Sequence, residues 1–203
     1  MIFCVGRNYA AHVREMALHG APSAAPRSAS DPVVFLKPPQ ALVAPPGPLT
    51  FPAGVGEVHH EAELVVRVGE GGRAEAVALG LDLTDRTRQA EAKQQGAPWA
   101  AAKGFRGSAP VGPFVPVVRL PDLARLAFTL HVNGALRQRG ESADMLHPVP
   151  TVLAYLERWF GLRPGDLVFT GTPEGVGPVK AGDVLDLALE GVPEAAARFV
   201  VAA

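Results

Sequence analysis

Two glutamates and an aspartate stand inside apolar stretches of this chain. Glu61 and Glu63 alternate with apolar residues up to Val66, and Asp82 lies between two leucines in a later apolar run. Residues two apart on a strand point to the same face at a spacing of roughly 6.6 Å, so Glu61 and Glu63 project together. Carboxylates side by side in an apolar setting need a compensating cation, and no basic residue alternates with these two.

A hard divalent cation fits this donor set best. Ligation by carboxylate oxygens alone is typical of Mg2+, and Mn2+ or Ca2+ could substitute. An isolated Glu-x-Glu pair also fits an edge strand whose carboxylates face solvent. Because Asp82 lies in a second apolar run, the combination of Glu61, Glu63 and Asp82 favours a metal site over that alternative.

His12 and Glu15 form a second candidate pair. They are three residues apart in a segment that we expect to be helical, so they share a face and can hydrogen-bond. A carboxylate on one imidazole nitrogen orients the ring and raises its basicity toward water. The same spacing is frequent on solvated helices, so the catalytic role of His12 and Glu15 depends on what lies beside them.

Three more polar side chains occur close to these motifs. Lys103 follows the apolar run 99–102, where an ammonium is desolvated unless it meets an anion such as a substrate carboxylate or oxyanion. The alternative is that it reaches the surface or pairs with a structural acid. Arg86 and Gln89 are three residues apart at the start of a predicted helix just after Asp82, so they would face the same region.

Residues 170–177 form a glycine-rich segment around Thr172. Its backbone N–H groups and hydroxyls could receive a carboxylate, although an ordinary turn between strands looks similar. The remaining histidines are better explained as core or surface residues than as ligands: His59, His60, His131 and His147.

These residues must be positioned by a mostly β, α+β domain. Alternation and turn residues predict strands at 1–5, 33–37, 61–68, 76–82, 128–136 with a hairpin Asn-Gly, 166–170, 183–187 and 197–201. Helices are predicted at 10–20 with Asn8 as N-cap, at 86–95 capped by Thr84 or Asp85 and ended by Gly96, and at 151–160. Residues 18–31 are rich in Pro, Ser and Ala, which is typical of a mobile loop that could act as a lid.

Composition narrows the class of protein and of partner. The 203 residues fit one domain, which we take to be 1–203, with two small domains as the alternative. A formal net charge of −1 and the absence of a basic run argue against nucleic acid and against an anionic membrane surface, which leaves a small molecule as the expected partner. The N-terminal residues do not read as a signal peptide, and Cys4 is the single cysteine, so we expect a cytoplasmic protein with Cys4 buried in its first strand.

Taken together, these segments resemble the fumarylacetoacetate hydrolase family. They are most similar to its single-domain branch of acylpyruvate hydrolases and 2-hydroxyhepta-2,4-diene-1,7-dioate isomerase-like proteins. The motifs that carry the resemblance span nearly the whole chain: Gly6-Arg7-Asn8-Tyr9-Ala10-Ala11-His12 with Glu15, Phe35-Leu36-Lys37-Pro38, His59-His60-Glu61-Ala62-Glu63-Leu64, Leu81-Asp82-Leu83-Thr84-Asp85-Arg86, Gln89, Ala102-Lys103-Gly104-Phe105 and Thr170-Gly171-Thr172-Pro173.

The resemblance implies a mixed β-sandwich rolled on itself, a homodimer, and Mg2+ held by three carboxylates. It also implies a catalytic role for Lys103 and activation of water by His12 and Glu15. Substrate or oxyanion contacts are implied for four residues: Arg86, Gln89, Lys103 and Thr172.

The implied activity is hydrolysis of a carbon–carbon bond in an acylpyruvate, a 2,4-dioxo acid, through a metal-bound pyruvate enolate. The same site would serve an isomerase of the homoprotocatechuate pathway or an oxaloacetate decarboxylase, because each passes through the same enolate. An alternative of another class is a noncatalytic domain in which the carboxylates hold a structural Ca2+. Metal-dependent turnover of a 2-oxo acid would separate the enzyme from that domain.

Overall fold

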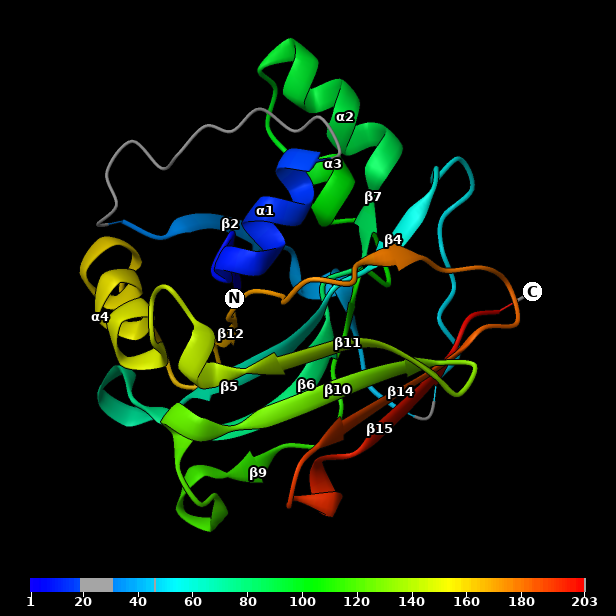
Figure 1. Cartoon of the computed structure of the whole chain (residues 1–203). Helices are drawn as coiled ribbons and strands as arrows, with labels where there is room; N and C mark the ends of the chain where they lie inside the picture. The colour runs from blue at the N-terminus through cyan, green and yellow to red at the C-terminus, as the bar shows by residue number, and fades with distance from the viewer. Residues whose placement is uncertain (19–30, 46, 203) are drawn as a thin grey trace.

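Strands make up most of the regular structure; α1, α2 and α3 lie toward the top of Figure 1, and α4 lies at the side of the sheets. The computed structural model describes residues 1–18, 31–45 and 47–202. Within these residues the helices are α1 (Ala10–Leu18), α2 (Arg86–Gln95), α3 (Ala100–Lys103) and α4 (Val149–Phe160). The mostly β, α+β class predicted from the sequence is confirmed.

The strands of the described residues pair into sheets of different size. A mixed sheet has the order β2 (Val33–Lys37), β1 (Ile2–Gly6), β12 (Leu167–Phe169), β5 (Ala62–Val68), β6 (Ala74–Leu81), β9 (Val115–Pro116). An antiparallel sheet has the order β11 (Ala135–Glu141), β10 (Ala127–Val132), β14 (Val184–Leu189), β15 (Ala197–Val200). Short strands complete the fold: β13 (Gly177–Pro178), β4 (Val58–His60) and β7 (Thr84–Asp85) in one group, and β3 (Leu42–Val43) with β8 (Ala109–Pro110) in another.

The two larger sheets pack face to face over the main hydrophobic core. Leu64 and Val66 of β5 belong to this core together with Phe128 and Leu130 of β10. Val65, which points the other way from β5, belongs to a second apolar cluster. Because β5 is buried on both faces, its sequence is a nearly continuous apolar run. Glu63 therefore shares the face of Val65, away from the sandwich core.

Helix α2 begins and ends where the sequence predicts. Asp85 is the N-cap, and its side chain accepts hydrogen bonds from the backbone N–H groups of Arg88 and Gly56. The helix ends at Gly96, whose φ of 64° is a left-handed conformation that glycine adopts without strain. This cap fixes where the first turn of α2 lies relative to Asp82, three residues before Asp85.

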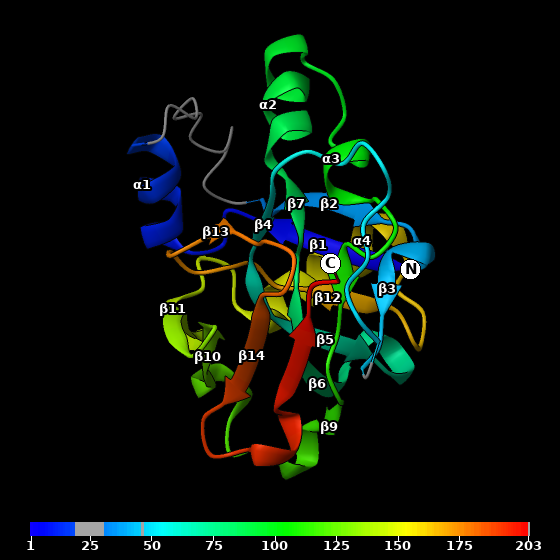
Figure 2. The ribbon, with the colours of Figure 1, turned by 90° about the vertical axis from the view of Figure 1, so that its right-hand side faces the viewer.

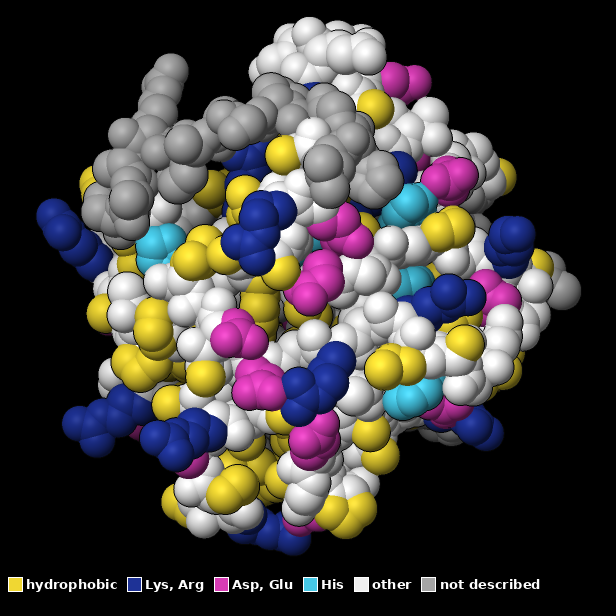
Figure 3. Space-filling model, viewed as in Figure 1, with side chains coloured by type: hydrophobic (Ala, Val, Ile, Leu, Met, Phe, Trp, Pro, Cys, Tyr) yellow, Lys and Arg dark blue, Asp and Glu magenta, His cyan; other side chains and the backbone are white. Residues whose placement is uncertain are grey.

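Helices α2 and α3 lie together at one end of the sheets beside β7, and Figure 2 shows α1 apart from them on the other side of β4 (Figures 1 and 2). The strand ends that carry the three carboxylates point toward this end. On the face shown in Figure 3, acidic and basic side chains are interspersed, in keeping with a formal net charge of −1. Of the helices that the structure describes, none has the length and hydropathy needed to cross a membrane.

Two local predictions are wrong. Asn8 does not cap α1: its side chain instead donates to the carbonyls of Thr170 and His147 and accepts from the His147 N–H, so it ties distant segments together. The apolar residues at 33–37 also predicted a buried strand, but β2 is the edge strand of its sheet and Leu36 is 43% exposed. The predicted burial of Cys4 in β1 is confirmed. The proposed lid at 18–31 lies almost entirely outside the described residues.

Candidate active site

The antiparallel pairing of β5 and β6 explains why three carboxylates meet. Ala62 of β5 stands opposite Leu81 of β6, so the residue before Ala62 and the residue after Leu81 are also opposite. The backbone N–H of Asp82 donates to the Glu61 carbonyl at 2.8 Å. Glu63 projects from β5 toward the same side, and one oxygen from each of Glu61, Glu63 and Asp82 lies within 4.8 Å of the others. All three side chains are buried.

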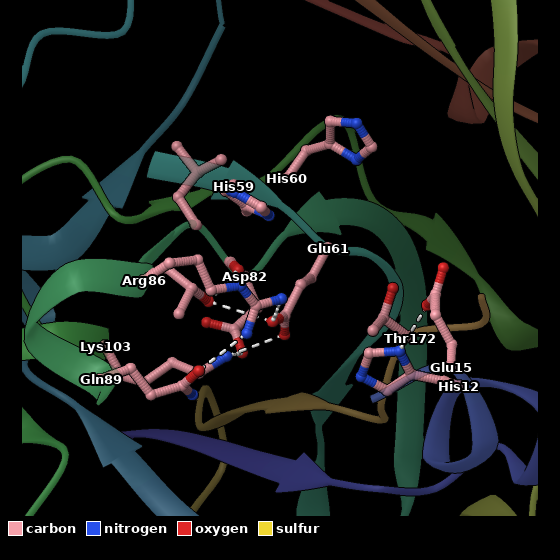
Figure 4. Close-up of polar contacts among 12 residues, drawn as sticks. His12, Glu15, His59, His60, Glu61, Asp82, Arg86, Gln89, Lys103 and Thr172 are labelled. Atoms are coloured by element: carbon pink, nitrogen blue, oxygen red, sulfur yellow. Dashed lines mark hydrogen bonds and ion pairs between the residues drawn. The ribbon is translucent and has the colours of Figure 1, made fainter. Parts of the chain in front are cut away.

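Three cationic side chains contact two of these carboxylates (Figure 4). Lys103 Nζ lies 2.8 Å from Glu61 Oε2 and 2.5 Å from Asp82 Oδ2. Arg86 Nη2 lies 2.7 Å from Glu61 Oε1, and Lys37 Nζ lies 2.8 Å from Asp82 Oδ1. The last two contacts have ion-pair distances without the alignment of a hydrogen bond. Charge compensation, which the sequence left to a metal alone, is thus supplied in part by the chain itself.

The surroundings shift the pKa values of the two glutamates in opposite directions. Burial by itself would raise the pKa of Glu61, but Lys103 and Arg86 hold that pKa well below its usual range. Burial and the nearby charges of Asp82 and Glu61 raise the pKa of Glu63 well above its usual range. The pKa of Lys103 is raised, because the attraction of Asp82 and Glu61 outweighs the effect of burial. Glu63 is therefore the member of the cluster whose charge is least compensated.

The donor set fits a divalent cation. Glu63 accepts a hydrogen bond from the Gly171 N–H at 2.7 Å, and no cationic side chain of the described residues lies within ion-pair distance of it. A hard cation that shares oxygens of Glu61, Glu63 and Asp82 would compensate Glu63, and three carboxylates with room for further ligands are what such ions prefer. Lys103 borders this position, because it already contacts two of the three carboxylates.

His12 and Glu15 lie on α1, on the opposite side of the site. His12 Nδ1 is 3.2 Å from Glu15 Oε2, and the other Glu15 oxygen accepts from the Gly175 N–H at 2.9 Å. The predicted pair therefore forms, and Glu15 is itself held by the turn after Thr172. In Figure 4 the pair stands beside Thr172 and apart from the cluster of Glu61, Asp82 and Lys103.

Thr172 is fixed by hydrogen bonds on two sides. Its hydroxyl donates to the Ala62 carbonyl at 2.9 Å and accepts from Gln138 Nε2 at 2.8 Å. Gln138 also donates to the Pro173 carbonyl, while its Oε1 accepts from the Ala62 N–H at 2.9 Å and lies 3.0 Å from His60 Nδ1. The buried Gln138 thus joins the strand between the two glutamates to the turn that carries Thr172.

The predicted residues surround one small pocket of about 50 Å3. The lining contains most of the predicted site residues: His12, Glu61, Glu63, Arg86, Gln89, Lys103 and Thr172. It also contains residues for which the sequence predicted no role: Val5, Gly6, Arg7, Met16, Phe35, Lys93 and Trp99. Arg86 and Gln89 face it together, as their spacing predicts, and are joined by a hydrogen bond of 2.8 Å from Arg86 Nη1 to Gln89 Oε1.

Two buried polar residues beside the pocket, Lys37 and Gln138, also received no role from the sequence. The Lys37 ammonium is fully buried and donates to the carbonyls of Leu83, Ser108 and Lys103 besides pairing with Asp82. A lysine inside an apolar strand was a usable signal, because a buried ammonium must have partners. Gln138 lies in a polar hairpin strand, where nothing in the local pattern distinguishes it.

The comparison with family models agrees with the resemblance in the motifs. Residues 1–200 match the model described as the C-terminal domain of fumarylacetoacetate (FAA) hydrolase. The chain belongs to the fumarylacetoacetate hydrolase family. The relatives whose names state an activity are isomerases or hydrolases, and this chain is an enzyme of the same family.

Individual relatives cover nearly the full length of the chain. Oxaloacetate tautomerase FAHD1, mitochondrial, of Bos taurus is 45% identical over 201 residues, which are 94% of this chain and 87% of that protein. Oxaloacetate tautomerase YcgM of Escherichia coli is 41% identical over 201 residues, with 94% and 88% covered. The crystal structure of fumarylpyruvate hydrolase from Pseudomonas aeruginosa in complex with Mn2+ and pyruvate superposes with a TM-score of 0.85 at 40% identity, covering 98% of this chain and 89% of that one.

Proposed function

We propose that this protein is a divalent-cation-dependent enzyme that acts on a 2-oxo acid through its enolate, and that its reaction is the keto–enol tautomerisation of oxaloacetate. One observation carries the proposal: a buried cluster of carboxylates and ammonium groups shares a pocket with an imidazole–carboxylate pair. The first group suits the stabilisation of an oxyanion, and the second suits the transfer of a proton. The choice of oxaloacetate is supported by the two tautomerases that are 45% and 41% identical to the chain.

We assign Glu61, Glu63 and Asp82 as ligands of the cation, with Mg2+ as the ion used in the cell and Mn2+ or Ca2+ as substitutes. When bound, the cation supplies Lewis acidity toward the oxygens of a 2-oxo acid. The chain's own contribution is to hold the three carboxylates at the ends of β5 and β6 and to place Lys103 beside them.

Tautomerisation moves one proton between C3 of the substrate and the oxygen on C2. Lys103 and Arg86 are placed to stabilise negative charge on that oxygen, because both ammonium and guanidinium reach the pocket while anchored on Glu61. Gln89 and Thr172 orient the substrate from the two sides of the pocket. His12, oriented by Glu15, takes the proton from one of the two positions and returns it to the other.

A second candidate is the hydrolysis of an acylpyruvate. It is supported by the similarity to fumarylpyruvate hydrolase of Pseudomonas aeruginosa. In this reaction His12 with Glu15 would take a proton from water, which attacks the distal carbonyl, and the pyruvate enolate leaves. The residues that hold the enolate are the same, so the difference lies in whether water has access to the distal carbonyl.

The test is a substrate panel with and without Mg2+. The purified protein is given the enol form of oxaloacetate, whose ultraviolet absorbance decays on conversion to the ketone, and in parallel acetylpyruvate and fumarylpyruvate, whose hydrolysis releases pyruvate. Carbon dioxide release from oxaloacetate is followed in the same samples and reports a decarboxylase. We expect fast, Mg2+-dependent decay of the enol. Binding of Ca2+ or Mg2+ with no turnover of any of these acids would instead support the noncatalytic domain.

The remaining assignments are proposals of the same kind. We propose that residues 1–203 form a single domain that assembles as a homodimer in the cytoplasm. Light scattering coupled to gel filtration measures the mass in solution, for which we expect twice the 21.2 kDa of one chain. Limited proteolysis tests the single domain, and cell fractionation tests the location.

A further inference from the structure

Helix α2 presents a third polar residue to the pocket beyond the two already described. Arg86, Gln89 and Lys93 are spaced i, i+3 and i+7, so they share one helix face, and all three line the pocket. At a rise of about 1.5 Å per residue, Lys93 begins about 6 Å farther along the helix than Gln89. This face therefore extends outward from the cluster of Glu61 and Asp82.

Lys93 differs from the other cations of the site in its partners. Lys37, Arg86 and Lys103 each form an ion pair with Glu61 or Asp82. Lys93 has no ion-pair partner among residues 1–18, 31–45 and 47–202. Instead it lies against an aromatic ring, with Nζ 5.9 Å from the centroid of Trp99. An ammonium that is half withdrawn from water without an anion is a group that gains from binding one.

An aromatic pair links the inner and the outer ammonium groups. Phe35 and Trp99 pack edge to face with ring centroids 6.1 Å apart. Lys103 Nζ lies 5.0 Å from the Phe35 ring, and Lys93 Nζ lies on the Trp99 side. A ligand whose first carboxylate lies near Lys103 would run along these rings toward Lys93. The apolar rings suit the carbon chain of the ligand, and the two ammonium groups suit its ends.

The charges of the site are not balanced. Apart from Arg7, the cationic side chains of the described residues that line the pocket or pair with its carboxylates are Lys37, Arg86, Lys93 and Lys103, and the carboxylates are Glu61, Glu63 and Asp82. A bound divalent cation adds to the positive excess. Burial, followed by the charges of Arg86 and Arg7, lowers the pKa of Lys93. A dianion compensates this excess better than a monoanion does.

We propose that Lys93 forms a distal anion subsite that recognises the second carboxylate of a dicarboxylic 2-oxo acid. This inference rests on the proposed function, since it assumes that the 2-oxo acid end lies at the inner cluster. It makes Lys93 a specificity-determining residue, which separates dicarboxylic substrates from 2-oxo acids with a neutral end. Oxaloacetate belongs to the first class, and acetylpyruvate belongs to the second.

The test compares oxaloacetate with its 4-methyl ester, which has the same 2-oxo acid end and a neutral distal end. We measure kcat/KM for tautomerisation of both compounds, and their binding by calorimetry with Mg2+ present, in the wild type and in Lys93→Met. Methionine keeps most of the apolar stem against Trp99 and removes the charge. We expect the preference for oxaloacetate to fall about tenfold or more, through KM, with the ester unaffected. Lys93→Arg should retain the preference.

Arg88→Met is the matched control. Arg88 lies on the same helix and carries the same charge, but it is exposed and is not part of the pocket lining. If Lys93→Met weakens both compounds equally, or leaves oxaloacetate unchanged, the subsite is refuted. If Arg88→Met lowers the preference for oxaloacetate as much as Lys93→Met does, the preference comes from the overall positive charge of α2 and Lys93 does not form a subsite. If the wild type turns over neither compound, the proposed function fails, and the calorimetric comparison still decides the role of Lys93.

Discussion

The two halves of this site are anchored in different ways. Glu61, Glu63 and Asp82 stand at the ends of paired strands and are completely enclosed, with Lys37 and Lys103 packed against them. His12 and Glu15 lie on α1, a helix of nine residues; their side chains contact each other, and Glu15 also accepts from the Gly175 N–H. The charged cluster is thus held by paired strands and several ion pairs, whereas the proton-transfer pair, although His12 is also buried, is held by a single short helix.

This difference predicts which substitutions should affect several properties of the protein at once and which should affect only one. A change in the cluster leaves buried charges without partners, so it should affect stability, metal binding and activity together. A change in the α1 pair leaves the core intact and should affect activity alone.

Asp82→Ala should be the most damaging substitution. It leaves Lys37 and Lys103 buried with a charge that Asp82 no longer compensates, and we expect a loss of about 3 to 5 kcal/mol in the free energy of unfolding together with loss of metal binding. Urea unfolding and calorimetric titration with Mn2+ measure the two effects. The control is Asp186→Ala, which breaks an exposed pair with Arg198 and should cost less than about 1 kcal/mol. Equal losses in the two variants would contradict the view of the cluster as core.

His12→Ala should lower turnover roughly a hundredfold or more and leave Mn2+ affinity and the unfolding midpoint unchanged. The reason is that His12 has Glu15 as its polar partner and, within the described residues, forms no hydrogen bond or ion pair with the three carboxylates. Arg14→Ala, an exposed change on the same helix, should leave turnover unaffected. A drop in metal affinity as large as the drop in turnover would show that the two halves of the site are not separable.

Gln138→Leu should have an intermediate effect, because Gln138 links the strand of the glutamates to the turn that holds both Glu63 and Glu15. We expect metal affinity to fall about tenfold, the usual scale for loss of a residue that orients ligands. Gln138→Glu keeps the acceptor for the Ala62 N–H but loses the donor to Thr172. Its metal affinity should therefore be close to that of the wild type, whereas its KM for the substrate should remain raised. Arg137→Ala, on the exposed side of the same strand, is the control.

The buried thiol of Cys4 offers a probe of core opening that requires no substitution at Cys4 itself, and it should give the smallest effect. Burial, followed by the charge of Asp82, raises the pKa of the Cys4 thiol well above its usual range. The folded protein holds the thiol neutral, so its contribution to stability is present below the unfolded pKa of about 8.5 and decreases as the pH rises above it. Labelling with a thiol reagent at pH 8 should therefore follow unfolding. We expect faster labelling in Asp82→Ala and an unchanged rate in His12→Ala; equal acceleration in both would contradict the comparison.

Local sequence determined much of this protein. The alternation around Glu63 predicted a strand with its carboxylates on one face, and Asp85 with Gly96 predicted both ends of α2, because these signals depend on neighbours in the chain. The spacing of Arg86 and Gln89, and of His12 and Glu15, predicted pairs that the structure contains. The combined motifs were sufficient for the family.

The tertiary structure alone decided which segments meet. Three sets of contacts join residues far apart in the chain. Lys37 and Lys103 pair with Asp82, and Gln138 hydrogen-bonds to both Ala62 and Thr172. Asn8 accepts a hydrogen bond from the His147 N–H. No local period encodes these contacts, since the register of β5 with β6 and the packing of α2 and α3 over the strand ends create them. Which charges compensate one another is therefore set by the fold, while the type of chemistry is set by the residues.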